Sequence, residues 1–167
     1  EDYYRKELTS YLQRKNFNNS HPMYENVMKN FQVAMCFYYA DASLRYFFEK
    51  AKKLKGFENT IFIIVGDHRQ EIFPTKSAID IYHVPFIVYS PMLKAPKEFN
   101  SVSSHENIVS TLVNFLGNNY GINIPAYVSW LGDNIDTCSS FRNIHSFAIM
   151  KNNKSIEQYV SGEYFIN

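Results

Sequence analysis

The run IFIIV at 61–65 restricts the fold of this chain more than any other segment. Consecutive β-branched and aromatic residues without polar alternation are typical of a strand buried on both faces, as in parallel sheets covered by helices. A second run of this kind, VPFIVY at 84–89, stops at Ser90-Pro91. Pro85 is compatible with it because the first residues of a strand need not donate to the ladder. We therefore predict two strands of a parallel sheet.

Helical patterns lie on both sides of these runs. Apolar residues recur at helical spacing over 25–55, which predicts a long amphipathic helix with one break. A short helix is predicted over 6–15, followed by a break at 16–22. The segment 103–106 has the S-x-x-E form of a capping box and predicts a helix that Gly117 ends. The order helix, strand, loop, strand, loop, helix predicts an α/β fold with parallel strands joined by crossovers.

The remaining segments set the expected domain organisation. We divide the chain into a polar lead-in over 1–24 and one α/β domain over 25–167, a length that can bury one sizeable core. Residues 118–145 are predicted to be rich in loops. The final part is predicted to form one or two short strands, at 146–150 and 163–166, at a sheet edge.

Charge and cysteine content exclude some classes of partner and site. The 17 basic and 16 acidic residues nearly cancel, so no overall positive field is available to hold nucleic acid or an anionic membrane surface. Cys36 and Cys138 are far apart in the sequence and lack CxxC spacing, so we expect free thiols. No stretch approaches the ~20 apolar residues of a membrane span.

Asp67 and His68 directly follow the first predicted strand. Ligands of open α/β sheets bind outside the carboxyl ends of the strands. A carboxylate beside an imidazole offers oxygen and nitrogen ligands that suit Zn²⁺ or Mn²⁺ better than Ca²⁺ or Mg²⁺. The alternative is a strand-end aspartate that caps a turn and a histidine held by hydrogen bonds, and the dipeptide by itself leaves both open.

Other polar and aromatic residues have weaker signals. The Arg69 guanidinium could bind an oxyanion or lie solvated in a loop. His105 falls in the first turn of the helix predicted after 103–106, where a structural role competes with substrate binding. Trp130 is either a core anchor or a wall for a substrate headgroup. We expect His21 and His145 to lie at the surface.

Three blocks together resemble the sulfatase family, and within it lipoteichoic acid synthase-like proteins. They are NTIFIIVGDH at 59–68, YHVPFIVYSP at 82–91 and SHENIVSTL at 104–112. The likeness covers roughly residues 25–135. It implies an alkaline phosphatase-like, partly parallel sheet flanked by helices, of which this chain is a C-terminal fragment.

The resemblance also implies a metal-dependent site for phosphoryl or sulfuryl transfer. It makes Asp67 and His68 metal ligands, and it makes His83 a candidate third ligand because two-metal relatives carry a histidine near that strand start. The family's Thr, Ser or modified Cys nucleophile lies upstream in its order, and nothing before residue 25 matches it. We therefore expect no catalytic residue in this chain and, for the chain alone, weak metal binding without turnover.

The expected function follows from this resemblance. The chain is predicted to be part of a sulfatase-like hydrolase or a phosphoglycerol or phosphoethanolamine transferase, acting on phosphate or sulfate esters that include lipid-linked or glycan headgroups. The alternative is a non-catalytic binding or structural module that keeps the fold. A flavodoxin-like domain is disfavoured because no Gly-rich phosphate loop follows a strand. The resemblance implies an extracytoplasmic domain of a membrane protein, and exposed sheet edges could drive self-association.

Overall fold

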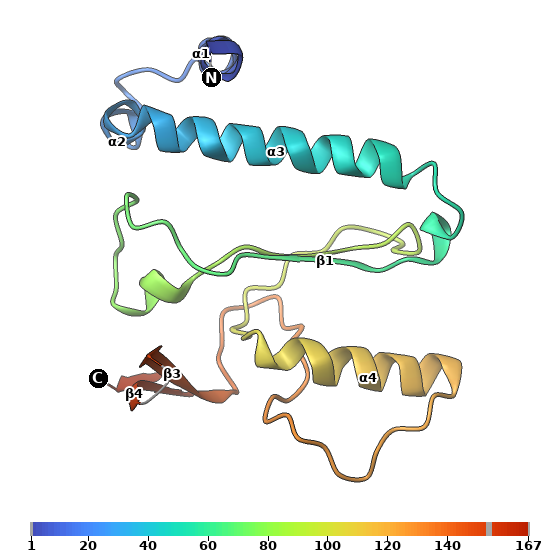
Figure 1. Ribbon diagram of the computed structural model, residues 1–167. Helices are drawn as coiled ribbons and strands as arrows, with labels where there is room; N and C mark the ends of the chain where they lie inside the picture. The colour runs from blue at the N-terminus through green and yellow to red at the C-terminus, as the bar shows by residue number, and fades with distance from the viewer. Residues whose placement is uncertain (1, 153–154, 167) are drawn as a thin grey trace. The chain divides into compact units, whose positions relative to one another are not determined.

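The computed structural model describes residues 2–152 and 155–166 (Figure 1). The chain divides into two compact units, Glu1–Lys94 and Ala95–Asn167, and each is described by itself. Among the described residues, no helix combines the length and the apolar character that crossing a membrane requires.

The first unit begins with three helices, α1 (Asp2–Arg14), α2 (Tyr24–Lys29) and α3 (Phe31–Ala51). The short helix predicted over 6–15 corresponds to α1, which ends at Arg14, and the predicted long helix is broken once, at Asn30. The side-chain amide of Asn30 donates to the Asn26 carbonyl at 2.9 Å. Helices α1 and α3 pack through aromatic side chains, with the rings of Tyr4 and Tyr39 perpendicular at 5.0 Å. Both helical predictions are confirmed.

A short 3₁₀ helix, η1 (Phe57–Asn59), leads from α3 into strand β1 (Phe62–Val65), and a second one, η2 (Ile79–Tyr82), precedes strand β2 (Phe86–Tyr89). Both strand predictions are confirmed, but the predicted parallel pairing is wrong. The two strands are antiparallel, with Phe62 opposite Tyr89 and Val65 opposite Phe86. The connection from β1 turns back, so that β2 begins beside the last residue of β1. There the Gly66 N–H donates to the Pro85 carbonyl at 3.0 Å. The connection therefore closes a long hairpin and not a crossover.

The prediction that β1 is buried on both faces is also wrong. One face is packed, because the Phe62 ring meets the rings of Phe48 at 5.0 Å and Phe57 at 5.5 Å. Elsewhere the two strands remain accessible, with Val65 39% and Ile87 50% exposed. A two-stranded sheet covered by one aromatic cluster explains why both strands are apolar without being fully buried.

The second unit contains helix α4 (Glu106–Tyr120). The predicted capping box is wrong: Ser103 Oγ has no hydrogen-bond partner in the described structure, and the helix begins at Glu106. Instead, the Asn107 side-chain oxygen accepts the Ser104 backbone N–H at 2.6 Å. The predicted end at Gly117 is wrong too, because the helix continues to Gly121, which adopts the left-handed conformation at φ 66°.

The second unit ends in a three-stranded antiparallel sheet of β3 (Ser146–Asn152), β4 (Ser155–Ser161) and β5 (Tyr164–Ile166). The sequence predicted strands at both ends of this region and missed the central one. Val160 in β4 is 2% exposed and is the most buried large side chain of the described residues. The segment between α4 and β3 has no helix or strand, as predicted for most of 118–145.

Candidate metal centre

The chain leaves β1 through Gly66, a position with little room for a side chain. A Cβ atom placed there would lie 3.0 Å from the Cβ of Val84 and 3.1 Å from the Cδ of Pro85. This close approach keeps the start of β2 against the end of β1. Asp67 and His68 therefore emerge from a fixed strand end, in the position that the sequence predicted for them.

Asp67 and His68 contact each other directly. The Asp67 carboxylate accepts the His68 backbone N–H at 2.9 Å, and the same oxygen lies 3.1 Å from His68 Nδ1. Both side chains are open to solvent, at 89% and 76% exposed. The pKa of the Asp67 carboxyl is lowered from its usual value of 3.8, first by the His68 backbone N–H and then by its own. Asp67 is consequently ionised at neutral pH and ready to bind a cation.

The contact between these two donors is a hydrogen-bonded ion pair, with the carboxylate oxygen and the imidazole nitrogen 3.1 Å apart. Binding of one metal ion by both side chains would replace this contact. Carboxylate oxygen with imidazole nitrogen is also a donor set suited to Zn²⁺ or Mn²⁺. The pair can therefore supply two adjacent ligands, which is half of a four-ligand site.

His83 lies on the returning side of the hairpin, shortly before β2, and is not gathered with the pair. If the β1–β2 register continued beyond the last ladder pair, His83 would face His68. However, in the part of the chain that the structure describes, no group of three or more His, Cys, Asp or Glu side chains is placed to hold a metal ion. The side chain of His83 is exposed, and its backbone N–H donates to the Asp80 carbonyl at 3.2 Å. That His83 is a third metal ligand remains a prediction.

Asp80, which the sequence analysis did not single out, organises the loop before His83. Its carboxylate accepts the backbone N–H groups of Lys76 at 2.8 Å and Ser77 at 2.9 Å. The pKa of Asp80 is lowered, chiefly by the Lys76 N–H and next by the Ser77 hydroxyl. A carboxylate with these contacts closes a turn. The sequence signal for it is an Asp placed three residues after Ser77 and four after Lys76.

Arg69 and His105 have local structural contacts. The Arg69 guanidinium donates to the backbone carbonyls of Phe73 and Pro74, which holds the loop after His68 in a tight turn. His105 is exposed at the start of α4, where its carbonyl accepts the Ile108 N–H at 3.2 Å. Substrate binding by either residue remains a prediction.

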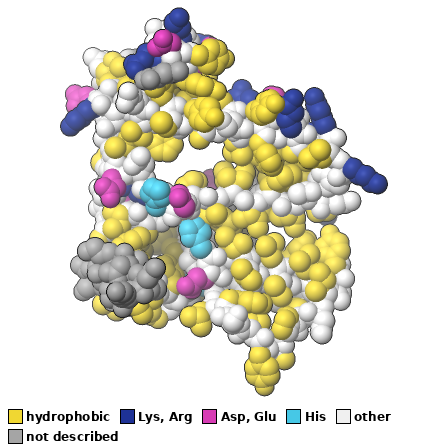
Figure 2. All heavy atoms as spheres, viewed as in Figure 1, with side chains coloured by type: hydrophobic (Ala, Val, Ile, Leu, Met, Phe, Trp, Pro, Cys, Tyr) yellow, Lys and Arg dark blue, Asp and Glu magenta, His cyan; other side chains and the backbone are white. Residues whose placement is uncertain are grey.

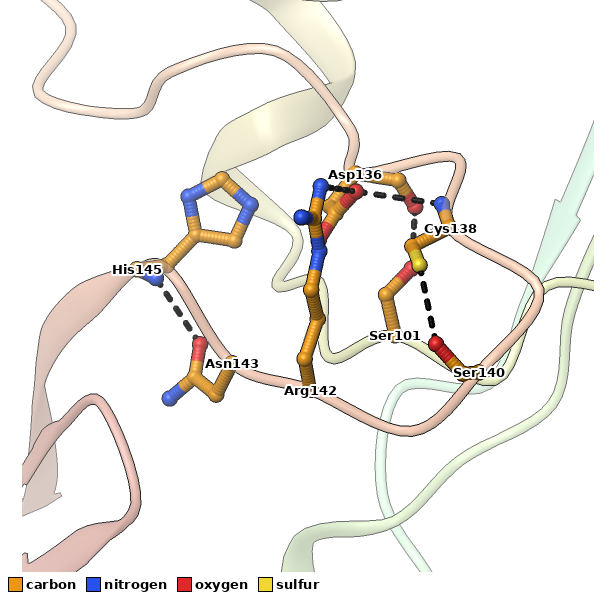
Figure 3. Close-up of polar contacts among 7 residues, drawn as sticks. All are labelled: Ser101, Asp136, Cys138, Ser140, Arg142, Asn143 and His145. Atoms are coloured by element: carbon orange, nitrogen blue, oxygen red, sulfur yellow. Dashed lines mark hydrogen bonds and ion pairs between the residues drawn. The ribbon is translucent and has the colours of Figure 1, made fainter.

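An ion pair in the second unit joins a buried carboxylate to a half-exposed guanidinium, and the sequence analysis missed it (Figure 3). The Arg142 guanidinium donates to both carboxylate oxygens of Asp136, at 2.7 and 2.8 Å, while the Asp136 side chain is 3% exposed. The Asp136 carbonyl accepts the Ser101 hydroxyl, and the Arg142 carbonyl accepts the Val102 N–H at 2.9 Å. The cluster therefore fastens the 136–142 loop to the segment before α4.

His145 lies beside this cluster and corrects another expectation. It is 6% exposed, and its Nε2 is buried without a hydrogen-bond partner in the described structure, so its predicted surface position is wrong. The reason is its place in a closed turn, where its backbone N–H donates to Asn143 Oδ1 at 2.9 Å and its carbonyl accepts the Gly162 N–H. His21 is exposed, as predicted. Cys36 and Cys138 are free thiols, also as predicted.

The Asp136–Arg142 pair predicts an acid-sensitive contribution to stability. The pKa of Asp136 is lowered, chiefly by the Arg142 side chain. A carboxyl with a lowered pKa stabilises the folded state above its unfolded pKa, near 3.8, and that contribution is lost as the pH falls through the lower folded pKa. The melting temperature of Asp136→Asn should therefore lie below that of the unmodified chain at pH 7, and the gap should narrow below about pH 4. A gap that stays constant between pH 7 and pH 2.5 would contradict this account.

Comparison with known proteins adds one finding. A model of the sulfatase family matches residues 6–118. That range includes Asp67, His68 and His83, and it ends before the Asp136–Arg142 pair. No curated protein and no solved structure matches the chain.

Proposed function

Because the chain belongs to the sulfatase family, within the alkaline phosphatase superfamily, we propose that it forms part of a metal-dependent enzyme that cleaves or transfers phosphate or sulfate esters. One observation carries the proposal: Asp67 and His68 follow β1 directly, with both side chains open to solvent, inside the segment that the family model matches. Phosphoglycerol and phosphoethanolamine transfer belong to the same proposal, with lipid-linked or glycan headgroups as substrates.

In this proposal, Asp67 and His68 are two ligands of a divalent cation, Mn²⁺ or Zn²⁺ in preference to Ca²⁺ or Mg²⁺. The bound cation supplies Lewis-acid chemistry, which lowers the pKa of a nucleophile and neutralises charge on the transferring group. Asp67 contributes a carboxylate that is already ionised. The hydrogen bonds of Arg69 to the Phe73 and Pro74 carbonyls hold the loop that follows His68. His83, one residue before β2, is the proposed third ligand from this chain.

The remaining parts of the site are proposed to come from other sequence of the whole protein. The family resemblance orders the nucleophile, a Thr, Ser or modified Cys, before the segment that carries the Asp-His pair. A complete site needs about four ligands, and this chain offers two that are adjacent. We place the whole protein outside the cytoplasm and attached to a membrane, in keeping with the same resemblance.

Removing the metal from the whole protein tests this proposal. After treatment with EDTA, hydrolysis of an aryl phosphate and of an aryl sulfate should fall to background, and added Mn²⁺ or Zn²⁺ should restore one of them. Ca²⁺ or Mg²⁺ should restore less activity than Mn²⁺ or Zn²⁺, because imidazole nitrogen is a poor ligand for Ca²⁺ and Mg²⁺. Hydrolysis that persists unchanged in EDTA would overturn the proposal. A protein without hydrolysis or metal binding under any condition would favour the non-catalytic binding module.

A further inference from the structure

An open apolar hollow of about 250 Å³ lies in the first unit, where the last turn of α3 meets η1 and β1. Its apolar lining includes Phe47, Leu54, Phe57 and Phe62, and the stems of Lys50 and Lys55 also line it. Leu54 is 67% and Phe47 50% exposed. Because these side chains stay accessible, folding of the chain buries little of their apolar surface. The surface that they form is therefore available to a partner.

A basic run lies at the end of α3, and two of its lysines, Lys50 and Lys55, line the hollow. Lys50, Lys52, Lys53 and Lys55 fall within six residues, and all four are exposed. None of them forms an ion pair with any residue that the structure describes, although the Lys50 ammonium lies over the Tyr46 ring, 4.9 Å from its centroid. Figure 2 shows Lys and Arg side chains gathered over the end of α3 that leads toward β1. Glu49 and Glu58 flank the run without lining the hollow. The charge offered here is therefore locally positive, although the whole chain has a net charge of +1.

We propose that this basic apolar corner, formed by Phe47, Leu54 and the four lysines, binds the surface of a membrane that contains anionic lipid. Lysine ammonium groups are attracted to anionic headgroups, and exposed leucine and phenylalanine enter the boundary between headgroups and acyl chains. A soluble anion would meet the lysines but leave the apolar side chains in water. An apolar protein partner would cover the hollow but leave the lysines unmatched. A lipid surface complements both parts.

The corner is separated from the candidate metal pair by the length of β1. Phe62, at the first position of the strand, lines the hollow, and Asp67 follows its last residue. At about 3.3 Å per residue the two lie roughly 16 Å apart along the chain. Lipid binding at the corner therefore leaves Asp67 and His68 free, and loss of one activity does not require loss of the other.

Vesicle flotation of this chain tests the proposal. The chain should float with vesicles of phosphatidylcholine and phosphatidylglycerol, and it should not float with phosphatidylcholine alone. The fourfold variant Lys50→Gln, Lys52→Gln, Lys53→Gln and Lys55→Gln should bind the anionic vesicles at least about tenfold more weakly. A matched variant, with Gln at Lys6, Lys29, Lys76 and Lys94, has the same net charge and should bind within about twofold of the unmodified chain.

The apolar part has its own variant. Leu54→Ser keeps all lysines and should weaken vesicle binding severalfold, with circular dichroism of each variant confirming its helical content. Equal losses in the two fourfold variants would show that net charge alone drives binding and would overturn the proposal. Unchanged binding of Leu54→Ser, or full competition by soluble glycerol phosphate, would overturn it as well, since either result assigns binding to headgroup charge without insertion.

Discussion

Substitution of Asp67 by alanine should lower the metal-dependent ester cleavage of the whole protein by more than about a hundredfold, since even residues behind a metal ligand change affinity or activity ten- to a hundredfold. The substitution removes the carboxylate whose oxygen lies 3.1 Å from His68 Nδ1. The variant therefore lacks one of the two proposed metal ligands and keeps only the His68 imidazole. Initial rates on an aryl phosphate and an aryl sulfate, at saturating Mn²⁺ or Zn²⁺, measure the effect.

A matched control separates metal binding from loop folding. Asp80→Ala also removes a carboxylate of the same unit, one that is half-buried and accepts the Lys76 and Ser77 N–H groups. It should retain most of the activity, with a modest loss if the displaced loop moves His83. Equal activity losses in the two variants would mean that a general loss of negative charge, and not a metal ligand, explains the Asp67 result.

Substitution of Gly132 by alanine should destabilise the second unit strongly. A Cβ atom at this position would overlap the backbone carbonyl of Glu106, the first residue of α4, and backbone cannot rotate away as a side chain can. The next residues are tied to the same helix, because the Asp133 carbonyl accepts the Asn107 amide at 2.9 Å and the Ile135 N–H donates to Thr111 Oγ1 at 2.8 Å. Overpacking here should cost about 3 kcal/mol, which lowers the melting temperature by roughly 12 °C or more.

Gly121 provides the control for this substitution. It has a positive φ of 66°, and nothing lies within 4 Å of an added Cβ atom. Gly121→Asn should therefore cost less than about 1 kcal/mol, since asparagine tolerates the left-handed conformation. Thermal unfolding followed by circular dichroism compares the two variants. If Gly132→Ala melted at the temperature of the unmodified chain, the described contact between the 132–135 segment and α4 would be contradicted.

Local patterns predicted the elements well because their signals are contained in a few neighbouring residues. The run at 61–65 needs only its β-branched and aromatic side chains to form a strand, and the periodicity over 25–55 produced the helices on both sides of Asn30. Pairing was not predictable in the same way. Whether two strands run parallel depends on the path of the connection, and 66–85 has no periodicity that reveals a return to the same end.

The capping segment illustrates a different limit. The S-x-x-E spacing at 103–106 matches the usual pattern, yet the Asn107 side chain accepts the Ser104 N–H and competes for the same backbone groups. Asn and Asp side chains bond nearby backbone in several ways, so one pattern does not determine which is formed. Gly117 shows the same ambiguity, since a glycine in a helical pattern either ends the helix or lies against a neighbour, here Ile124.

The candidate site was partly predictable for a related reason. Asp67 and His68 are adjacent in sequence, so their position after a strand places both donors together without any long-range information. Asp136 and Arg142 pair across a loop that has no regular structure, and His145 is buried by a turn closed with Gly162. Nothing in their spacing indicates burial, because loop residues are brought together by the path of the backbone.

Manganese binding by the whole protein tests the central claim, that Asp67 and His68 are ligands of a divalent metal ion, most directly. Titration followed by electron paramagnetic resonance of free Mn²⁺ measures the affinity without requiring a substrate. The double variant Asp67→Ala, His68→Ala should bind Mn²⁺ more than about a hundredfold more weakly, while His21→Ala should bind it as the unmodified protein does. An unchanged Mn²⁺ affinity in the double variant would contradict the account.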